Sequence, residues 1–162
     1  MAHVHTPGDH LTPDHPVLPL EEQLALAASV CTDAGESLTP LRRRVLELLL
    51  CAPGATKAYD ILDKLGGKAP AKPPTIYRAL EFLVRMGFAH KVESLNAFVA
   101  CGIGSCQRTT VFLICQDCLR TVEVDAGHAL VDVDAAAHAA GFSLSRTILE
   151  AYGQCAGCRA AD

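Results

Sequence analysis

The apolar residues in the first half of the chain recur at intervals of three and four positions, which is the period of an amphipathic helix. This pattern predicts helices over residues 21–34, from Pro40 to about Ala52, over residues 58–65 and from Pro73 to about Met86. Threonine caps a first turn well and proline is tolerated there, so Thr39-Pro40 is typical of a helix start. Gly35 and Gly87 are expected to end the first and fourth helices.

The fourth segment, TIYRALEFLVRM, carries the clearest apolar stripe. Its residues at helical spacing are expected to face a core: Ile76, Leu80, Leu83 and Val84. The second helix is expected to bury Leu41, Val45, Leu48 and Leu49. Its three successive arginines lie mostly off that face.

After Gly87 the pattern becomes strand-like, and FAHKVES and AFVAC predict the two strands of a hairpin across Leu95-Asn96. Helices followed by a hairpin, in the part of the chain that carries net positive charge, describe a winged helix-turn-helix domain. Beyond Cys101, the strand-like TTVFLI and RTVEV, a helical stretch near residues 128–140 and SLSRTILEAY predict a small α/β second domain.

The predicted fold class is therefore α+β. Residues 1–19, rich in histidine and proline, are expected to be a flexible tail, and residues 20–94 the winged-helix domain. Residues 95–101 are expected to be a hinge, and residues 102–162 a zinc-containing dimerisation domain.

Half of the 162 residues are apolar, which is enough for a core, yet no apolar run is long enough to cross a membrane. The N-terminus also lacks the order of an export signal, so we expect a cytoplasmic protein with no membrane partner. Eight cysteines without such a signal, several in Cys-X-X-Cys pairs, favour metal binding over disulfides.

The net charge of −4 hides a segregation along the chain. Residues 1–36 carry −6 and residues 92–162 carry −4, whereas residues 37–91 hold ten bases and four acids, a net charge of +6. A basic middle segment can present a cationic face to DNA. Tyr77 and Arg78 are candidates for base contacts. The remaining candidates for DNA contact, chiefly to phosphates, are Arg42, Arg43, Arg44, Lys57, Lys72 and Thr75.

Two Cys-X-X-Cys pairs, at Cys115 and Cys118 and at Cys155 and Cys158, each supply half of a tetrahedral zinc site. Together they predict one structural Cys₄ site that joins a strand end to the C-terminus across 36 intervening residues. Two separate redox pairs are the alternative, but neither pair is expected at the strand-to-helix junction that a thioredoxin-like motif needs.

A second candidate site lies near the domain boundary. Cys101 and Cys106 flank a Gly-Ile-Gly-Ser loop that would let their sulfurs converge, and His90 and Glu123 are further plausible ligands. Cys31 and Cys51 are expected to be small hydrophobic residues of the core.

These motifs resemble the ferric uptake regulator family, and within it the zinc uptake regulator branch, from about Glu21 to Arg159. The stretches that carry the resemblance are LTPLRRRVLELLL, AKPPTIYRALEFLVRMGFAHKVES, FLICQDCLRTVEV and AYGQCAGC. The resemblance implies a homodimer that binds operator DNA when loaded with zinc and represses zinc-uptake genes. It also implies structural zinc at the four paired cysteines.

The same resemblance places the sensing metal at His90, Cys101 and Glu123. Where the branch commonly has a fourth ligand, a histidine, this chain has Arg108, and Cys106 is the substitute. Two zinc ions per chain are therefore expected. Two thiolates, an imidazole and a carboxylate suit tetrahedral zinc better than iron. Zinc bound there would tie the two domains together, and a dimer would read a palindromic operator.

Three other functions remain open. An iron- or peroxide-responsive regulator of the same family is one, and a redox switch at Cys101 and Cys106 is another. A zinc enzyme is the third, but the chain lacks the His-X-Glu of nucleobase deaminases and the HExxH of zinc hydrolases. We therefore expect neither an enzyme nor a small-molecule substrate.

Overall fold

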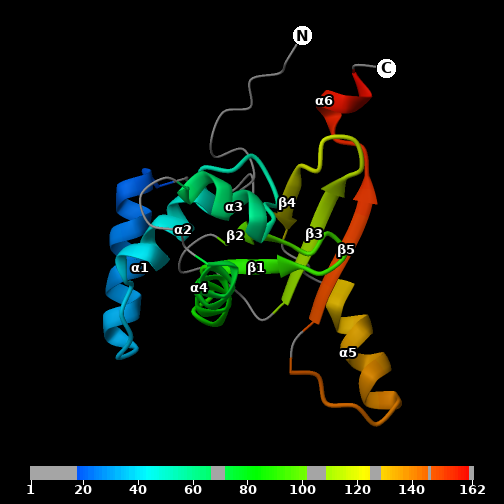
Figure 1. Ribbon diagram of the computed structural model, residues 1–162. Coiled ribbons are helices and arrows are strands. Elements are labelled where there is room, and N and C mark those ends of the chain that lie inside the picture. Colours follow the sequence, from blue (N-terminus) through cyan, green and yellow to red (C-terminus); the bar gives the residue numbers. More distant parts are fainter. Residues whose placement is uncertain (1–17, 67–71, 102–108, 125–128, 146, 161–162) are drawn as a thin grey trace. The chain divides into compact units, whose positions relative to one another are not determined.

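A computed structural model describes residues 18–66, 72–101, 109–124, 129–145 and 147–160. Most of the expected N-terminal tail, residues 1–17, lies outside the described residues, and so does Cys106. The chain divides into two compact units, Met1–Cys106 and Gln107–Asp162 (Figure 1).

The first unit consists of four helices followed by a hairpin, as the hydrophobic pattern predicts. The helices are α1 (Leu20–Asp33), α2 (Pro40–Leu50), α3 (Ala58–Leu65) and α4 (Pro73–Arg85), and the strands are β1 (Ala89–Val92) and β2 (Ala97–Ala100). Pro40 is the first residue of α2, and the Thr39 hydroxyl accepts a hydrogen bond from the Arg42 amide at 3.5 Å. The predicted helix start is thus confirmed.

Glycines in the left-handed conformation end α1 and α4. Gly35 has φ 69° and Gly87 has φ 75°, a region that disfavours residues with a Cβ. After each glycine, the next amide donates a hydrogen bond back into the last turn, from Glu36 to the Cys31 carbonyl and from Phe88 to the Leu83 carbonyl, each at 2.8 Å. This is the Schellman motif, and it fixes the direction in which the chain leaves each helix.

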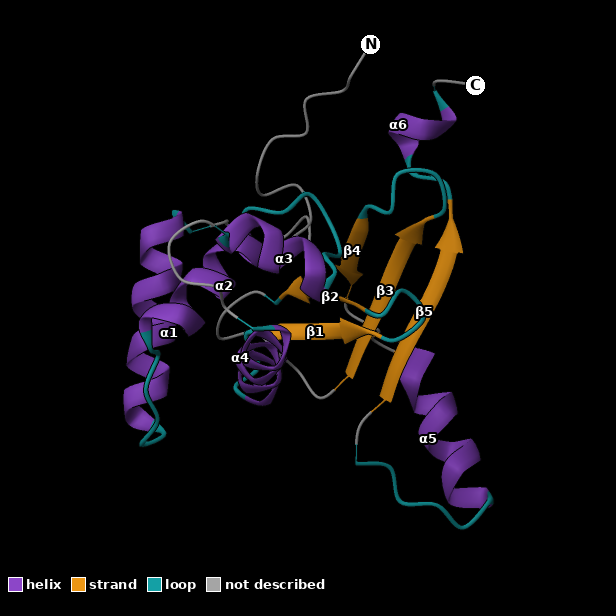
Figure 2. Ribbon diagram, viewed as in Figure 1, coloured by secondary structure: helices purple, strands orange, loops and turns teal. Residues whose placement is uncertain are grey.

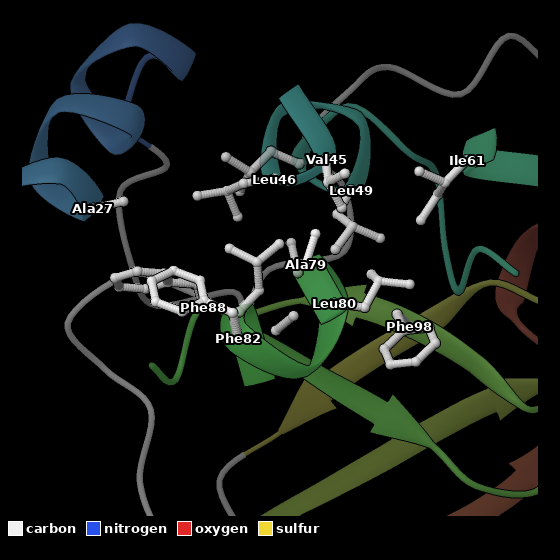
Figure 3. Packing of buried hydrophobic residues seen from close by; sticks show 14 of the residues in the cluster. Ala27, Val45, Leu46, Leu49, Ile61, Ala79, Leu80, Phe82, Phe88 and Phe98 are labelled. Atoms are coloured by element: carbon white, nitrogen blue, oxygen red, sulfur yellow. The ribbon is translucent and has the colours of Figure 1, made fainter. Parts of the chain in front are cut away.

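The core of the first unit lies between α2 and α4. Figure 3 shows Val45, Leu46 and Leu49 of α2 facing Leu80 of α4, with Phe98 of β2 beside it. The buried face of α2 differs from the expected one, because Leu46 and Leu50 are buried while Leu41 and Leu48 are only half-buried. Buried residues of α4 likewise include Ala79 and Phe82, which the predicted stripe omits.

The hairpin of the wing is antiparallel, with Ala89 opposite Ala100 and Val92 opposite Ala97. Thr56, just before α3, adds a bridge to Phe98 with backbone hydrogen bonds of 2.8 and 2.9 Å. Residues 97–100, expected to belong to a hinge, are thus a paired strand of the wing. The hairpin predicted from FAHKVES and AFVAC is thus confirmed.

The second unit contains a three-stranded sheet of order β4-β3-β5 (Figure 2). Its strands are β3 (Thr109–Cys115), β4 (Thr121–Val124) and β5 (Thr147–Gly153), and its helices are α5 (Ala129–Ala139) and α6 (Ala156–Arg159). β4 pairs antiparallel to β3 through a short turn, whereas β5 runs parallel to β3 after the connection that contains α5. The predicted α/β second domain is confirmed.

None of the helices in the described ranges has the length and apolar character that a membrane span requires.

Candidate metal centre and nucleic-acid interface

The four paired cysteines converge at one end of the sheet in the second unit. The sulfurs of Cys115, Cys118, Cys155 and Cys158 all lie within 4.8 Å of one another. The Cys118 and Cys155 sulfurs are 3.8 Å apart. Four sulfurs bonded to a tetrahedral zinc at 2.3 Å would be separated by about 3.8 Å. The cluster therefore has the size of a tetrahedral metal site.

Strand pairing brings the two halves of this cluster together. In the parallel ladder Cys115 lies opposite Gly153, and the Gln116 amide donates a hydrogen bond of 2.9 Å to the Gly153 carbonyl. Cys118 lies in the turn after β3, whereas Cys155 follows β5 by two residues and is the N-cap residue of α6. The second pair therefore does lie at a strand-to-helix junction, contrary to the prediction, because a short helix follows β5. The 36 residues between the two pairs therefore contain β4, α5 and β5, which return the chain to the end of β3.

The local hydrogen bonds favour a thiolate at the first cysteine. The amides of Cys118 and Cys155 point at the Cys115 sulfur and lower the pKa of its thiol to about 6, and the Cys155 amide lies 3.3 Å from that sulfur. In contrast, the neighbouring thiols of Cys155 and Cys118 raise the pKa of Cys158. Four crowded thiols cannot all ionise without a cation among them, so this donor set fits a divalent soft metal.

Two of the expected regulatory ligands, His90 and Cys101, lie on the wing. The Cys101 amide donates a hydrogen bond of 3.0 Å to the Phe88 carbonyl, which extends the hairpin by one pair beyond Ala89 and Ala100. His90, two residues after Phe88, shares one face of the hairpin with Cys101 and is its diagonal neighbour. Both residues are buried, with 3% of His90 and 0% of Cys101 exposed.

The other two expected ligands are not placed with them. Glu123 belongs to β4 in the second unit, where it lies opposite Phe112. Cys106 is outside the described residues. The four-ligand regulatory site therefore remains a prediction.

The predicted DNA-contacting residues of the first unit lie on α4 and at the starts of α3 and α4. Thr75 and Arg78 are exposed on α4, whereas Tyr77 is half-buried against the core. Lys57 and Lys72 are exposed and are the N-cap residues of α3 and α4. Amide groups at a helix start favour anions, so a lysine there adds charge where a phosphate can bind.

The three successive arginines of α2 each contact an acidic side chain. Arg43 pairs with Glu21 at 2.6 Å and Arg44 with Glu47 at 2.7 Å. Arg42 lies 3.9 Å from Glu36 and also stacks on the ring of Phe82. The sequence pattern did not indicate these partners, because most of them come from other elements.

The two remaining described cysteines differ from each other. Cys31 is fully buried in the core, as expected, and burial raises the pKa of its thiol. Cys51 is exposed, contrary to the expectation that it packs in the core. The reason is that α2 ends at Leu50, so Cys51 follows the helix as its C-cap residue.

The chain is similar to zinc uptake regulators in both sequence and structure. It is 41% identical over 141 residues to the zinc uptake regulation protein of Escherichia coli (strain K12), covering 85% of this chain and 82% of that protein. The corresponding protein of Shigella flexneri gives the same values. A scan against protein-family models finds no match.

Among solved structures, a zinc uptake regulator complexed with zinc and DNA is 39% identical, with a TM-score of 0.84 over 90% of this chain and 98% of that one. The holo form of XcZur is 40% identical, with a TM-score of 0.78 over 88% of this chain and 99% of that one. These relatives confirm the resemblance drawn from the motifs: the chain belongs to the ferric uptake regulator family, in its zinc uptake regulator branch.

Proposed function

We propose that this protein is a zinc-responsive transcriptional repressor, which binds palindromic operator DNA as a zinc-loaded homodimer in the cytoplasm and represses genes for zinc uptake. The observation that carries this proposal is the similarity, over nearly the whole chain, to a regulator solved with zinc and DNA. The chain's membership of a regulator family also answers the enzyme alternative, because its relatives are regulators and not enzymes.

The structural zinc would be held by Cys115, Cys118, Cys155 and Cys158. The supporting evidence is the convergence of four sulfurs within 4.8 Å and their thiolate-stabilising amides. An all-thiolate tetrahedral set with no open position is typical of structural zinc. Its role is to join the end of β3 to the C-terminal helix α6.

The regulatory zinc would be held by His90, Cys101, Cys106 and Glu123, giving two zinc ions per chain. Support comes from the shared hairpin face of His90 and Cys101, where two buried groups of the right donor type are diagonal neighbours. Because Glu123 belongs to the other unit, zinc at this site would couple the two units. Zinc would favour the DNA-binding arrangement, and DNA would tighten zinc binding in return.

Homodimer formation is supported by the surface of the second unit. β5 is an outer strand of the described sheet and is seven residues long, and a long edge strand is a template for pairing with another strand. Nearby elements expose large apolar side chains, with 63% of Val131 and 66% of Phe142 accessible. A second copy covering this surface would remove apolar area from water.

DNA binding would use α4 in the major groove. Arg78 can read guanine edges, Tyr77 can pack on a thymine methyl, and Thr75 lies at the same exposed start of the helix. Lys57, Lys72, Arg43 and Arg44 would contact phosphates, with the two arginines exchanging their carboxylate partners for DNA. Binding should therefore weaken steeply with salt.

The test begins with a palindromic duplex selected from random-sequence DNA by the zinc-loaded protein. Gel-shift titrations at buffered free zinc, and in parallel at buffered free Fe²⁺, should show retardation that depends on zinc alone. Native mass spectrometry should find two zinc ions per chain, one of them removed by mild chelation together with operator binding. Operator binding triggered by Fe²⁺ and not by zinc would contradict the proposed metal response.

Cys101→Ser should isolate the regulatory site. We expect this variant to stay folded and dimeric, to keep one zinc ion per chain, and to lose zinc-dependent retardation of the operator. Cys106→Ser should do the same, and an unchanged zinc titration for Cys106→Ser would show that the fourth ligand is another group.

A further inference from the structure

Four residues from three segments of the first unit form a cluster around the C-terminal half of α4. The guanidinium carbon of Arg42 lies 3.4 Å from the centre of the Phe82 ring, and that of Arg85 lies 5.3 Å from it. One carboxylate, Glu36, accepts a hydrogen bond from Arg85 at 2.7 Å and lies 3.9 Å from Arg42. The cluster thus connects the turn after α1, the first turn of α2 and the last turns of α4.

The backbone holds Glu36 in the position from which it reaches both arginines. Gly35 adopts the left-handed conformation after α1, and the Glu36 amide then donates to the Cys31 carbonyl at 2.8 Å. Arg42 donates a further hydrogen bond of 2.7 Å to the Ser37 carbonyl. Its guanidinium is therefore fixed by a ring face, a carbonyl oxygen and a nearby carboxylate.

These contacts leave Arg42 poorly suited to a phosphate. Its side chain is only 27% exposed, compared with 40% for Arg43 and 50% for Arg44. The planar guanidinium lies on Phe82, which is itself 3% exposed and part of the core. A phosphate would have to compete with all these contacts at once.

We propose that Arg42 is a positioning residue for the recognition helix: stacked on Phe82 and held together with Arg85 by Glu36, it sets the orientation of α4 relative to α2. The proposal rests on operator binding by α4, as proposed above. Base readout requires Arg78 and its neighbours to meet base edges at hydrogen-bond distance, whereas phosphate contacts tolerate small rotations of the helix. Loss of the cluster should therefore lower sequence specificity more than general DNA affinity.

The test compares Arg42→Lys and Arg42→Gln with the wild type on the selected operator and on a duplex of scrambled sequence, over a range of salt. Lysine keeps the charge but cannot stack as a planar fork. We expect both variants to lose about tenfold in the ratio of operator to scrambled affinity. The salt dependence of Arg42→Gln should stay as in the wild type, because no phosphate contact has been removed.

A phosphate contact predicts a different result. Arg42→Lys would then resemble the wild type, whereas Arg42→Gln would weaken binding to both duplexes alike. In Arg42→Gln the slope of the logarithm of the binding constant against the logarithm of the salt concentration would also become shallower by about 1. Either finding would overturn the proposal. Circular dichroism melting and the zinc count of each variant show whether the fold is intact.

Glu36→Gln separates an effect of charge on DNA affinity from an effect of helix position on sequence specificity. Removing a negative charge near DNA should raise affinity for every duplex if charge alone matters. Positioning instead predicts that the ratio of operator to scrambled affinity falls, because Arg42 and Arg85 lose their shared carboxylate. Glu21→Gln is the matched control, since Glu21 pairs with Arg43 outside the cluster and its loss should leave the ratio unchanged.

A wild-type protein without preference for any operator would overturn the proposed function itself. A wild type with operator preference and an Arg42→Lys variant that shares it would overturn only the role of Arg42.

Discussion

Among the described residues of the first unit, eighteen are buried in one apolar cluster that joins the four helices to the wing. The second unit buries few of its described side chains: Phe112, Ile114, Cys115 and Thr121. Among the described residues, six of the nine exposed large apolar side chains belong to the second unit: Leu113, Leu119, Val131, Phe142, Leu144 and Tyr152. A unit of 56 residues with so little core needs other sources of stability. The four-cysteine cluster and a second copy of the chain can provide them.

The two units therefore differ in what stabilises them. The unit that reads DNA keeps its shape through apolar packing, so it can stay folded whether or not metal is bound. The unit that would dimerise depends on ligands and partners for its stability, because metal binding and subunit association both add free energy of folding. Three further experiments test this comparison, from the largest expected effect to the smallest.

Cys115→Ser should have the largest effect, confined to the second unit. Structural zinc can contribute on the order of 10 kcal/mol to folding, and this substitution removes the ligand with the most favourable thiolate environment. We expect loss of the dimer in sedimentation experiments and loss of the tightly bound zinc. Cys51→Ser, at an exposed cysteine outside both sites, is the control. An intact dimer with a full zinc count in the Cys115→Ser variant would refute the assignment of this cluster as structural.

Leu80→Ala should destabilise the first unit without releasing the zinc of the four-cysteine cluster in the second unit. Leu80 is fully buried, and the cavity left by this change costs about 2–5 kcal/mol. Denaturant unfolding followed by circular dichroism should reveal the loss, while the zinc at the four-cysteine cluster and the dimer persist. Concurrent loss of the zinc at the four-cysteine cluster would mean that the two units do not differ in the proposed way.

Gly35→Ala and Gly141→Ala form a matched pair with the smallest effect. Both glycines follow a helix in the left-handed conformation, with φ 69° and 79°, and an added Cβ meets no atom within 4 Å at either position. The cost is therefore backbone strain alone, about 1 kcal/mol. We expect Gly35→Ala to lower the unfolding free energy of the first unit by about as much as Gly141→Ala lowers that of the second. A much larger decrease for Gly35→Ala would show that displacement of Glu36 adds to the strain.

Much of the fold follows from local patterns in the sequence. The helices α1 to α4 were predictable because apolar spacing, Thr39-Pro40 and the glycines that end helices act within a few residues. The convergence of two Cys-X-X-Cys pairs was predictable because each pair supplies two thiolates on a tight turn, which is half of a tetrahedral zinc site.

Features that depend on packing between elements were not predictable. Phe82 lies off the expected stripe of α4, and its burial depends on how α2 crosses that helix. Arg42 and Phe82 are forty positions apart, so nothing in the spacing indicates that one stacks on the other. The second strand of the hairpin, by contrast, was predictable from the apolar stretch AFVAC, which forms β2.

Because β3 and β5 are paired in a parallel ladder, the cysteine cluster can form only when these two strands are in the correct register. Cys115 lies opposite Gly153, and the second cysteine pair begins two residues later. A slip of β5 by one residue would shift that pair by about 3.3 Å and turn each side chain of the strand to the other face of the sheet. Four sulfurs would then no longer surround one ion. Metal binding would therefore stabilise only chains in which β5 is correctly aligned with β3, and misaligned chains would remain without metal.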